Sequence, residues 1–338
     1  MTKKEDFFAL ISGEEYQNIP FMPITMMLAA DKIGCLYGEY ATKAIIQAEG
    51  QLLIAEEFQT THLSAISDPA VEAADLGALV MMSNDAPPAI NENYALLLDK
   101  AKLRSLKPIK PEYGRRMSNR LQAVDLMKEK SGGSLIIEGW VEGPCAEAAD
   151  LRGINHLMMD FFDDSAFVED LMDLCTEQAI EFALKQLEAG ADLIGIGDAA
   201  SSLIGPEFYK QFVLPRMCRY VDAVHQKGGL VRLHICGNIN SLFLYIAKLG
   251  VDMIDLDSMV SIESARQYLG SNVALAGNLD PVSEVKDSYP AAILERLKSC
   301  HKEAAGPFIV GAGCEIPRGT PDANLEIMGE FSRTLMNH

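Results

Sequence analysis

The chain has 338 residues, of which 49% are hydrophobic and 23% charged, and its formal net charge is −19. This acidic balance excludes non-specific nucleic-acid binding and disfavours anionic membrane surfaces, because both need clustered Lys and Arg. No window of about 18 apolar residues occurs, so no segment is predicted to span a membrane.

The N-terminus and the cysteines point to a cytoplasmic protein. The first residues, MTKKEDFFALISGEE, contain no long apolar run and no small-residue cleavage site, so they predict an amphipathic first helix rather than a signal peptide. The seven cysteines are odd in number and scattered along the chain. This usage is typical of reduced thiols rather than of a disulfide framework.

Short apolar segments alternate with helical patterns along the chain. The predicted strands are 21–25, 62–66, 135–140, 193–197, 231–235, 253–256, 273–276 and 308–310. A further short strand at 78–82 is predicted to form half of a hairpin with the segment after Pro87-Pro88. One helical pattern carries four apolar residues on one face, namely Phe167, Leu171, Leu174 and Phe182. Another opens at Gly205-Pro206-Glu207, with proline in its first turn.

Eight strands that alternate with helices predict parallel pairing and an α/β fold, a closed (β/α)8 TIM barrel. We expect residues 1–338 to form a single barrel domain with an N-terminal helical extension. A doubly wound open sheet is the alternative.

Two Gly-x-Gly sequences raise the question of a dinucleotide site. Gly195-Ile-Gly197 is followed by Asp198, and Gly311-Ala-Gly313 is followed by Cys314. Neither has the third glycine at the required spacing, and an aspartate in a phosphate cradle would repel its ligand. The pattern therefore disfavours nucleotide binding.

Polar side chains gather where the predicted strands end, which is where barrels of this class carry out their chemistry. They are Glu142, Asp198, His234 with Cys236, Asp257, Asn278 with Asp280, and Cys314 with Glu315.

The sequence LVRLHICGNI places His234 and Cys236 at the mouth of one predicted strand. Residues i and i+2 of a strand point to the same face with Cα atoms about 6.5–7 Å apart, and leaning side chains can bring their tips to the ~3.5 Å that tetrahedral zinc needs. Cys314 follows the last predicted strand and comes off the same rim. His234, Cys236 and Cys314 therefore predict a Zn²⁺ site with a fourth position left for substrate or water. The alternative is that all three fill space in the core.

At these residues the chain resembles the uroporphyrinogen decarboxylase superfamily. The resemblance is carried by EAGADLIGIGDAASSLIGPEFYKQFVLPRM, VRLHICGNI, VALAGNLDP and GAGCEIPRGTPDANLEIM, and it runs nearly end to end. Within the superfamily, the His-x-Cys followed by a distant Cys resembles the zinc-dependent, corrinoid-linked methyltransferases, such as the methylcobalamin:coenzyme M methyltransferases.

This resemblance implies an enzyme built on a (β/α)8 barrel with zinc at its C-terminal mouth. The implied reaction moves a methyl group between a corrinoid and a thiol or another small acceptor or donor. A thiol at the open zinc position would be held as a thiolate and attack the methyl group of methyl-Co(III). With a methyl donor instead, zinc would act as a Lewis acid on the leaving heteroatom. Both directions of transfer fit the sequence.

The chain departs from the decarboxylase itself in the stretch IPFMPITMMLAADKIG. The decarboxylase has an arginine-rich segment there that binds substrate carboxylates, and this chain has no arginine in it. A tetrapyrrole decarboxylase stays an alternative, as does a non-catalytic barrel that binds metal or corrinoid.

Two further site roles are predicted. Asp198 could orient His234 through the second ring nitrogen, as carboxylates commonly do behind metal-bound histidines. Its alternative is to cap the helix that starts near Gly205. Glu142 or Glu315 could serve as a resting fourth ligand that substrate displaces, and Cys145 could approach the site from beyond its strand.

The resemblance also implies a partner. No DxHxxG-type motif for gripping cobalt occurs in the chain, so the corrinoid is expected on a separate protein that docks transiently over the barrel mouth. Segment 85–114, with its four prolines, is predicted to form part of that rim, or alternatively to be a passive excursion.

Overall fold

The computed structural model of the chain describes residues 1–333, and residues 334–338 of the expected domain lie outside it. Seven parallel strands form one curved sheet in the order β1-β4-β5-β6-β7-β8-β9. Their bounds are β1 His62–Ser64, β4 Ile136–Glu142, β5 Leu193–Gly197, β6 Leu230–His234, β7 Met253–Leu256, β8 Ala274–Gly277 and β9 Phe308–Ile309. The predicted alternation of strands and helices in an α/β fold is thus confirmed.

The segment Pro20 to Met22 closes the ring between the two edge strands. The N–H of Val310, directly after β9, donates to the carbonyl of Pro20, and the N–H of Met22 donates to the carbonyl of Val310. On the other side, the N–H of Thr61 donates to the carbonyl of Phe21, directly before β1. The sheet therefore closes into the expected barrel, with this segment in the first strand position.

The strand predicted at 21–25 is wrong in extent, because only Phe21 forms a bridge, with Val310. Pro20 and Pro23 flank this bridge, and proline has no N–H to donate to a ladder. The other predicted strands are confirmed to within two residues at their ends.

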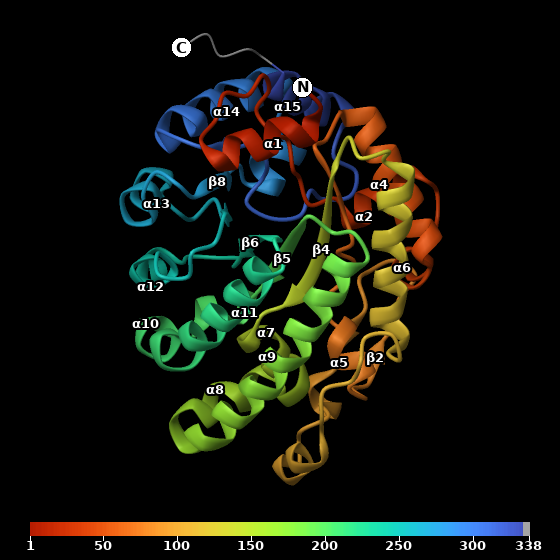
Figure 1. Cartoon of the computed structure of the whole chain (residues 1–338), viewed down its shortest axis with the longest axis vertical. Helices are drawn as coiled ribbons and strands as arrows, with labels where there is room; N and C mark the ends of the chain where they lie inside the picture. The colour runs from red at the N-terminus through yellow and green to blue at the C-terminus, as the bar shows by residue number, and fades with distance from the viewer. Residues whose placement is uncertain (334–338) are drawn as a thin grey trace.

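Helices surround the barrel on its outer face (Figure 1). The α-helices are α1 Lys3–Ser12, α2 Met26–Lys32, α3 Tyr37–Thr42, α4 Ala44–Phe58, α5 Val71–Asp75, α6 Arg115–Lys130, α7 Pro144–Arg152, α8 Ile154–Asp163, α9 Ser165–Glu188, α10 Gly205–Phe208, α11 Leu214–Gln226, α12 Phe243–Ile246, α13 Ile262–Leu269, α14 Pro290–Ala304 and α15 Asp322–Ser332. Short 3₁₀ turns are η1 Glu92–Tyr94, η2 Lys100–Ser105, η3 Ala199–Leu203 and η5 Asn240–Leu242, and π turns are η4 Tyr209–Val213 and η6 Pro281–Lys286.

Helix α1 covers the N-terminal end of the barrel. A capping box between Thr2 and Glu5 starts the helix. Its buried Phe7 and Leu10 pack in one cluster with residues at the starts of the strands, including Ile136 and Leu193. The expected amphipathic first helix is confirmed, and it seals the end of the barrel opposite to the mouth.

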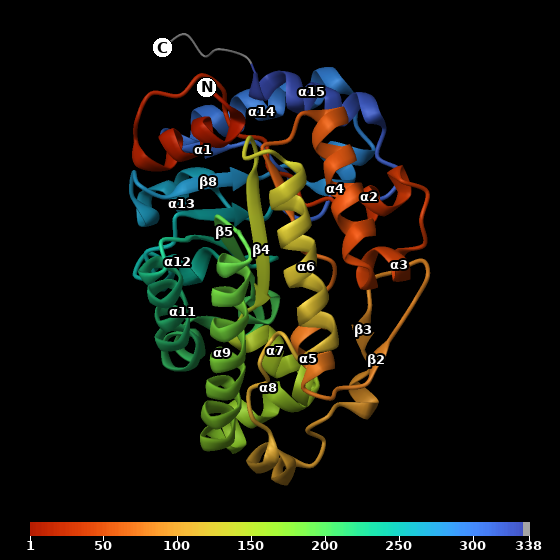
Figure 2. The ribbon, with the colours of Figure 1, turned by 45° about the vertical axis from the view of Figure 1, so that its right-hand side comes forward.

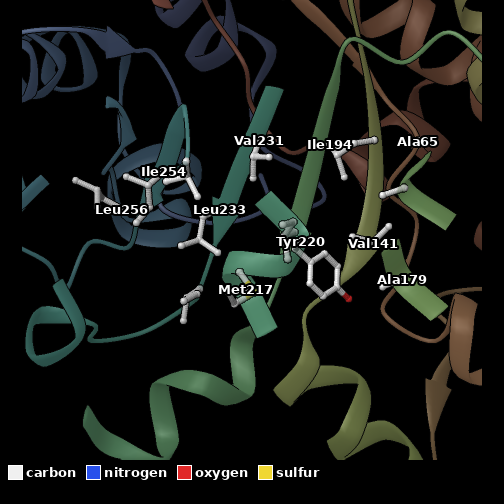
Figure 3. Packing of buried hydrophobic residues seen from close by; sticks show 14 of the residues in the cluster. Ala65, Val141, Ala179, Ile194, Met217, Tyr220, Val231, Leu233, Ile254 and Leu256 are labelled. Atoms are coloured by element: carbon white, nitrogen blue, oxygen red, sulfur yellow. The ribbon is translucent and has the colours of Figure 1, made fainter. Parts of the chain in front are cut away.

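The main core lies between the sheet and the outer helices. Val231 and Leu233 of β6 are buried, and Figure 3 shows them together with Met217 and Tyr220 of α11. Burying side chains of this size contributes about 1.5–3 kcal/mol each. Side chains alternate along a strand, so the neighbouring Arg232 and His234 of β6 point to the opposite face, into the barrel interior. This alternation delivers polar side chains to the mouth. The four predicted apolar residues of α9 are also buried, namely Phe167, Leu171, Leu174 and Phe182.

The predicted hairpin is present, as β2 Val80–Met81 pairs antiparallel with β3 Ala89–Ile90. The chain then continues through η1 and η2 to α6. In Figure 2 this stretch lies below α7 and α8, at the end of the molecule toward which β4 runs. Within residues 1–333, no helix is both long and apolar enough to cross a membrane.

Candidate metal centre

The end of strand β6, the loop that follows it and the loop after β9 bring His234, Cys236 and Cys314 together. His234 is the last residue of β6 and Cys236 follows two residues later. The N–H of Gly237 then donates to Asp257 and turns the chain out of the sheet. On the other side, a Cβ on Gly313 would lie 2.9 Å from the backbone of Asp257. Only glycine therefore lets the loop after β9 approach β7 closely enough to present Cys314.

The three side-chain tips have the spacing of a metal site. Nε2 of His234 lies 3.0 Å from Sγ of Cys236 and 3.8 Å from Sγ of Cys314, and the two sulfurs are 3.5 Å apart. In tetrahedral zinc sites, bonds of about 2.0–2.3 Å place ligand atoms roughly 3.3–3.8 Å apart. This trio is the one group of His, Cys, Asp and Glu ligand atoms within 4.8 Å of one another among residues 1–333. The donor set therefore fits Zn²⁺ in number and softness, and two of its three distances lie in this range, while that between His234 and Cys236 is about 0.3 Å shorter.

The two thiols of the trio differ in acidity. A hydrogen bond from Cys236 lowers the pKa of Cys314, burial opposes this effect, and a hydrogen bond from His234 acts in the same direction as the first, with a net result of about 4. The same hydrogen bond to Cys314, together with burial, raises the pKa of Cys236. Both cysteines are partly exposed at the mouth, whereas His234 is buried.

Asp255 holds the imidazole of His234 in place. Its Oδ2 lies 2.9 Å from Nδ1 of His234, and the same oxygen accepts from Nε of Arg232 at 2.8 Å. Arg232 in turn donates to Glu138 from Nη1 at 3.1 Å. With Nδ1 so engaged, Nε2 is the nitrogen that faces the two sulfurs. A carboxylate in this position is a common device behind metal-bound histidines. Burial lowers the pKa of His234, but the hydrogen bonds to Asp255 and Cys314 outweigh this effect and raise it to about 9.

The predicted contact of Asp198 with His234 is wrong, and so is the alternative that Asp198 caps the helix near Gly205. Its carboxylate accepts from the N–H groups of Cys145 and Ala146, at 3.0 and 2.8 Å, and from the hydroxyl of Ser201. It therefore caps α7, since the start of that helix crosses over the end of β5. Burial raises the pKa of Asp198 to about 6, against these hydrogen bonds.

The two predicted fourth ligands do not join the trio. Oε1 of Glu142 accepts from the indole N–H of Trp140 at 3.1 Å, and Oε1 of Glu315 accepts from the N–H of Met27 at 2.7 Å. Neither carboxylate belongs to the group of ligand atoms within 4.8 Å. Cys145 is buried at the start of α7 and lies outside that group as well.

Trp140 forms a wall beside the trio that the sequence did not identify. Its ring centre is 6.0 Å from that of His234, and it packs in a small separate cluster with Ile24 and Ile66. A Cβ on Gly195 would lie 2.2 Å from the indole, and one on Gly197 would lie 3.0 Å from it. The Gly195-Ile-Gly197 sequence therefore makes room for this side chain.

Behind Glu142 lies a buried group of carboxyls, which we call the acidic cluster: Glu72, Glu142, Glu147 and Asp150. Burial raises the pKa of each, and the neighbouring carboxyls add to the shift. For Glu72 the result is about 7, despite the hydrogen bond that it accepts from the N–H of Glu142. Both oxygens of Glu147 lack a hydrogen-bond partner.

Comparison with known proteins shows the family of the chain. The profile of "Uroporphyrinogen decarboxylase (URO-D)" matches residues 2–335. The methylcobamide:CoM methyltransferase MtbA of Methanosarcina acetivorans is 34% identical over 215 residues, 63% of this chain and 62% of that protein. The chain thus aligns with less than two thirds of the length of this relative.

Two further likenesses span almost the whole chain. The methylcobamide:CoM methyltransferase MtaA of Methanosarcina barkeri is 26% identical over 340 residues, 97% of this chain and 96% of that protein. A solved structure described as a methyltransferase from Methanosarcina mazei superposes with a TM-score of 0.84 at 23% identity, covers 98% of each chain, and confirms the fold. The family expected from the sequence is confirmed: the chain belongs to the uroporphyrinogen decarboxylase family.

Proposed function

We propose that the protein is a zinc-dependent methyltransferase that moves a methyl group between a corrinoid and a small thiol. The observation that carries the proposal is the trio of His234, Cys236 and Cys314, whose ligand atoms lie within 4.8 Å of one another at the barrel mouth. Three protein ligands leave one position of a tetrahedral ion for substrate, as catalytic rather than structural zinc sites do. The names of the relatives MtbA and MtaA support the corrinoid half of the reaction.

The residues of the chain would divide the work as follows. His234, Cys236 and Cys314 hold the ion, and Asp255 fixes the ring of His234 so that Nε2 faces it. A bound zinc ion would supply a Lewis acid that lowers the pKa of the incoming thiol. Trp140, Ile24 and Ile66 form an apolar wall beside the trio, which keeps water away from the reacting sulfur.

The transfer balances without a further reactant. The thiol loses its proton to solvent, and its sulfur forms a bond to the methyl carbon. The cobalt–carbon bond of methyl-Co(III) breaks with both electrons left on the metal, which gives Co(I). Run in reverse, the same geometry removes a methyl group from a thioether.

The corrinoid would arrive on a separate protein. A corrinoid is too large for a barrel interior that side chains already fill, so the methyl group has to approach the mouth from outside. Large apolar side chains are exposed on segments that follow the barrel strands, namely Met159 and Phe162 on α8, Leu203 on η3, and Met259 after β7. We call these four residues the apolar rim. We infer that the partner covers these side chains, because exposed apolar surface at a functional mouth is often part of a docking surface.

The free thiols fit a reducing, cytoplasmic compartment, and residues 1–338 would work as one barrel domain with the N-terminal helix as its seal. The decarboxylase alternative lacks the arginines that would hold substrate carboxylates, because 19–34 contains a single cation, Lys32, which pairs with Glu57 and Asp322.

The test is methyl transfer by the purified, zinc-loaded protein from methylcobalamin to a set of small thiols. Methylcobalamin should be consumed and the methyl thioether formed in equal amounts. The variant His234→Ala should abolish both, whereas His156→Ala, on the outer helix α8, should leave both unchanged. Equal rates with and without zinc would overturn the proposal.

A further inference from the structure

The segments that follow the eight barrel positions carry acids and no cations. In the first seven residues after each of these positions, all of which the structure describes, neither lysine nor arginine occurs. The acidic residues in the same segments are Asp68, Glu147, Asp198, Asp257, Glu263, Asp280, Glu284 and Glu315. These segments form the mouth of the barrel, where the trio lies.

The guanidinium groups that contact these segments already have carboxylate partners, since Arg116 pairs with Asp68 and Arg296 pairs with Glu284. Arg318, four residues after Cys314, binds both oxygens of Asp31 through Nε and Nη2 and donates from Nη1 to the carbonyl of Asp85. Arg232, below the trio, is 2% exposed and pairs with Asp255 and Glu138.

The wall beside the trio offers no charge either. Ile24, Ile66 and Trp140 pack against one another, and Met26 at the start of α2 packs on them from the rim. The one polar group of this wall, the indole N–H of Trp140, donates to Glu142. This wall therefore offers a ligand apolar carbon, and Asp257, bonded to the N–H of Gly237 next to Cys236, adds a carboxylate.

We propose that this centre selects thiols that carry no negative charge, and that it discriminates against anionic thiols such as 2-sulfanylethanesulfonate, which is coenzyme M. This inference rests on the proposed methyl transfer and names its substrate class. A sulfonate in this mouth would lose hydration without a free cationic partner, and it would face the carboxylate of Asp257, which lies close enough to Cys236 to act on it electrostatically. Such unfavourable charge is an effective way to reject a ligand. The relatives MtbA and MtaA are named for CoM, so the inference separates this chain from them by acceptor.

Three thiols test the inference: 2-sulfanylethanol, 2-sulfanylethylamine and 2-sulfanylethanesulfonate. They share a two-carbon chain and differ in the terminal group. Dissociation constants for the zinc-loaded protein are measured by calorimetry across pH, so that differences in thiol ionisation can be corrected. We expect the sulfonate to bind at least ~10-fold more weakly than the alcohol at low ionic strength. The ratio of the two dissociation constants should decrease at higher ionic strength, because salt screens the charges at the mouth. Equal or tighter binding of the sulfonate would overturn the inference.

A gained cation gives an independent check. Met26→Lys replaces a half-buried, unbranched side chain on the rim with one of similar length, whose stem can follow the same wall while the ammonium reaches water. This variant should improve sulfonate binding relative to the alcohol several-fold. The matched Phe8→Lys, exposed on α1 at the opposite end of the barrel, should leave the ratio unchanged. Equal ratios in Met26→Lys and Phe8→Lys would contradict the inference.

The two proposals fail in different ways. If the sulfonate binds more weakly than the alcohol but no thiol is methylated, the methyl-transfer proposal is wrong and the charge preference stands. If all are methylated and the sulfonate is the best acceptor, methyl transfer stands and the charge preference is wrong. If none of the three binds, both are wrong.

Discussion

Asp255 accepts a hydrogen bond from Nδ1 of His234 at 2.9 Å and one from Arg232 at 2.8 Å through the same carboxylate oxygen. All three side chains are buried. The imidazole therefore cannot rotate without breaking a charged network below it, and its Nε2 stays aimed at the two sulfurs. This relationship leads to the first prediction.

Asp255→Asn should weaken zinc binding by about 10–100-fold while leaving the fold intact, because the charge that orients and polarises His234 is lost. Competition with a chromophoric chelator measures the affinity, and circular dichroism monitors the fold. The control is Asp173→Asn, a partly exposed residue of α9 that pairs with Arg219 on α11. An affinity equal to that of the wild type would mean that Asp255 does not support the metal centre.

The second prediction concerns metal content. Elemental analysis should find about one zinc per wild-type chain, and Cys236→Ala and Cys314→Ala should each lose it. Cys218→Ala, which removes a half-buried thiol on α11 outside the trio, should retain it. We expect both variants to lose the metal and keep the fold, as for a catalytic site. Loss of a structural zinc would also destabilise the fold, because such an ion contributes folding energy outright. Full zinc in both trio variants would remove this site from consideration.

Much of this centre could be predicted from sequence, because its ligands follow strands that are bounded by glycine and aspartate. The His-x-Cys spacing sets both side chains on one face of β6, and the strand order brings Cys314 to the same rim. Asp255 was missed, although an acid inside an otherwise apolar strand is a signal that it faces a polar partner in the barrel. Asp198 was assigned wrongly because the sequence does not show that α7 begins directly over β5.

The single tryptophan of the chain gives the third prediction a direct readout. Gly195→Ala would bring a Cβ to 2.2 Å from the indole of Trp140, so the ring has to move. We expect a shifted emission maximum and a loss of about 1–3 kcal/mol of stability, as for other overpacked cores. Gly311→Ala is the control, since its Cβ would meet nothing closer than 3.8 Å. An unchanged emission spectrum in Gly195→Ala would contradict the placement of Trp140.

The acidic cluster gives the fourth prediction. Burial raises the pKa of Glu72 from 4.5 to about 7, so the folded chain holds a proton there that the unfolded chain releases. Its contribution to stability is complete below pH 4.5 and is lost as the pH rises toward and through 7. Glu72→Gln keeps an oxygen for the N–H of Glu142 but cannot ionise.

Urea unfolding from pH 4.5 to 8 should therefore show a flatter stability profile for Glu72→Gln than for the wild type. At pH 8 the variant should be more stable by up to about 3 kcal/mol, the equivalent of the pKa shift. Glu188→Gln, exposed at the end of α9, should follow the wild-type profile. Parallel profiles for the wild type and Glu72→Gln would show that Glu72 stays ionised in the folded state.

The last prediction concerns the corrinoid partner. Methyl transfer needs the attacking atom and the methyl carbon about 3–3.5 Å apart and in line, so the partner has to seat closely over the mouth. Phe162 is 78% exposed on α8 and Leu203 is 66% exposed on η3, directly after β5. Large apolar side chains at the centre of an interface commonly contribute more than 1 kcal/mol each. Phe162→Glu and Leu203→Glu should therefore raise the KM for a methylated corrinoid protein by roughly 10-fold or more, with the rate from free methylcobalamin unchanged.

The control is Phe8→Glu on α1, because this helix covers the opposite end of the barrel and its Phe8 is exposed to solvent. It should leave both reactions unchanged. Cross-linking to a candidate corrinoid protein encoded nearby, with mapping by mass spectrometry, locates the contact directly. Cross-links confined to the face of α1 would contradict docking over the mouth, even if zinc binding and methyl transfer from free methylcobalamin were both confirmed. Cobalt on that face would be separated from Cys236 and Cys314 by the packed interior of the barrel.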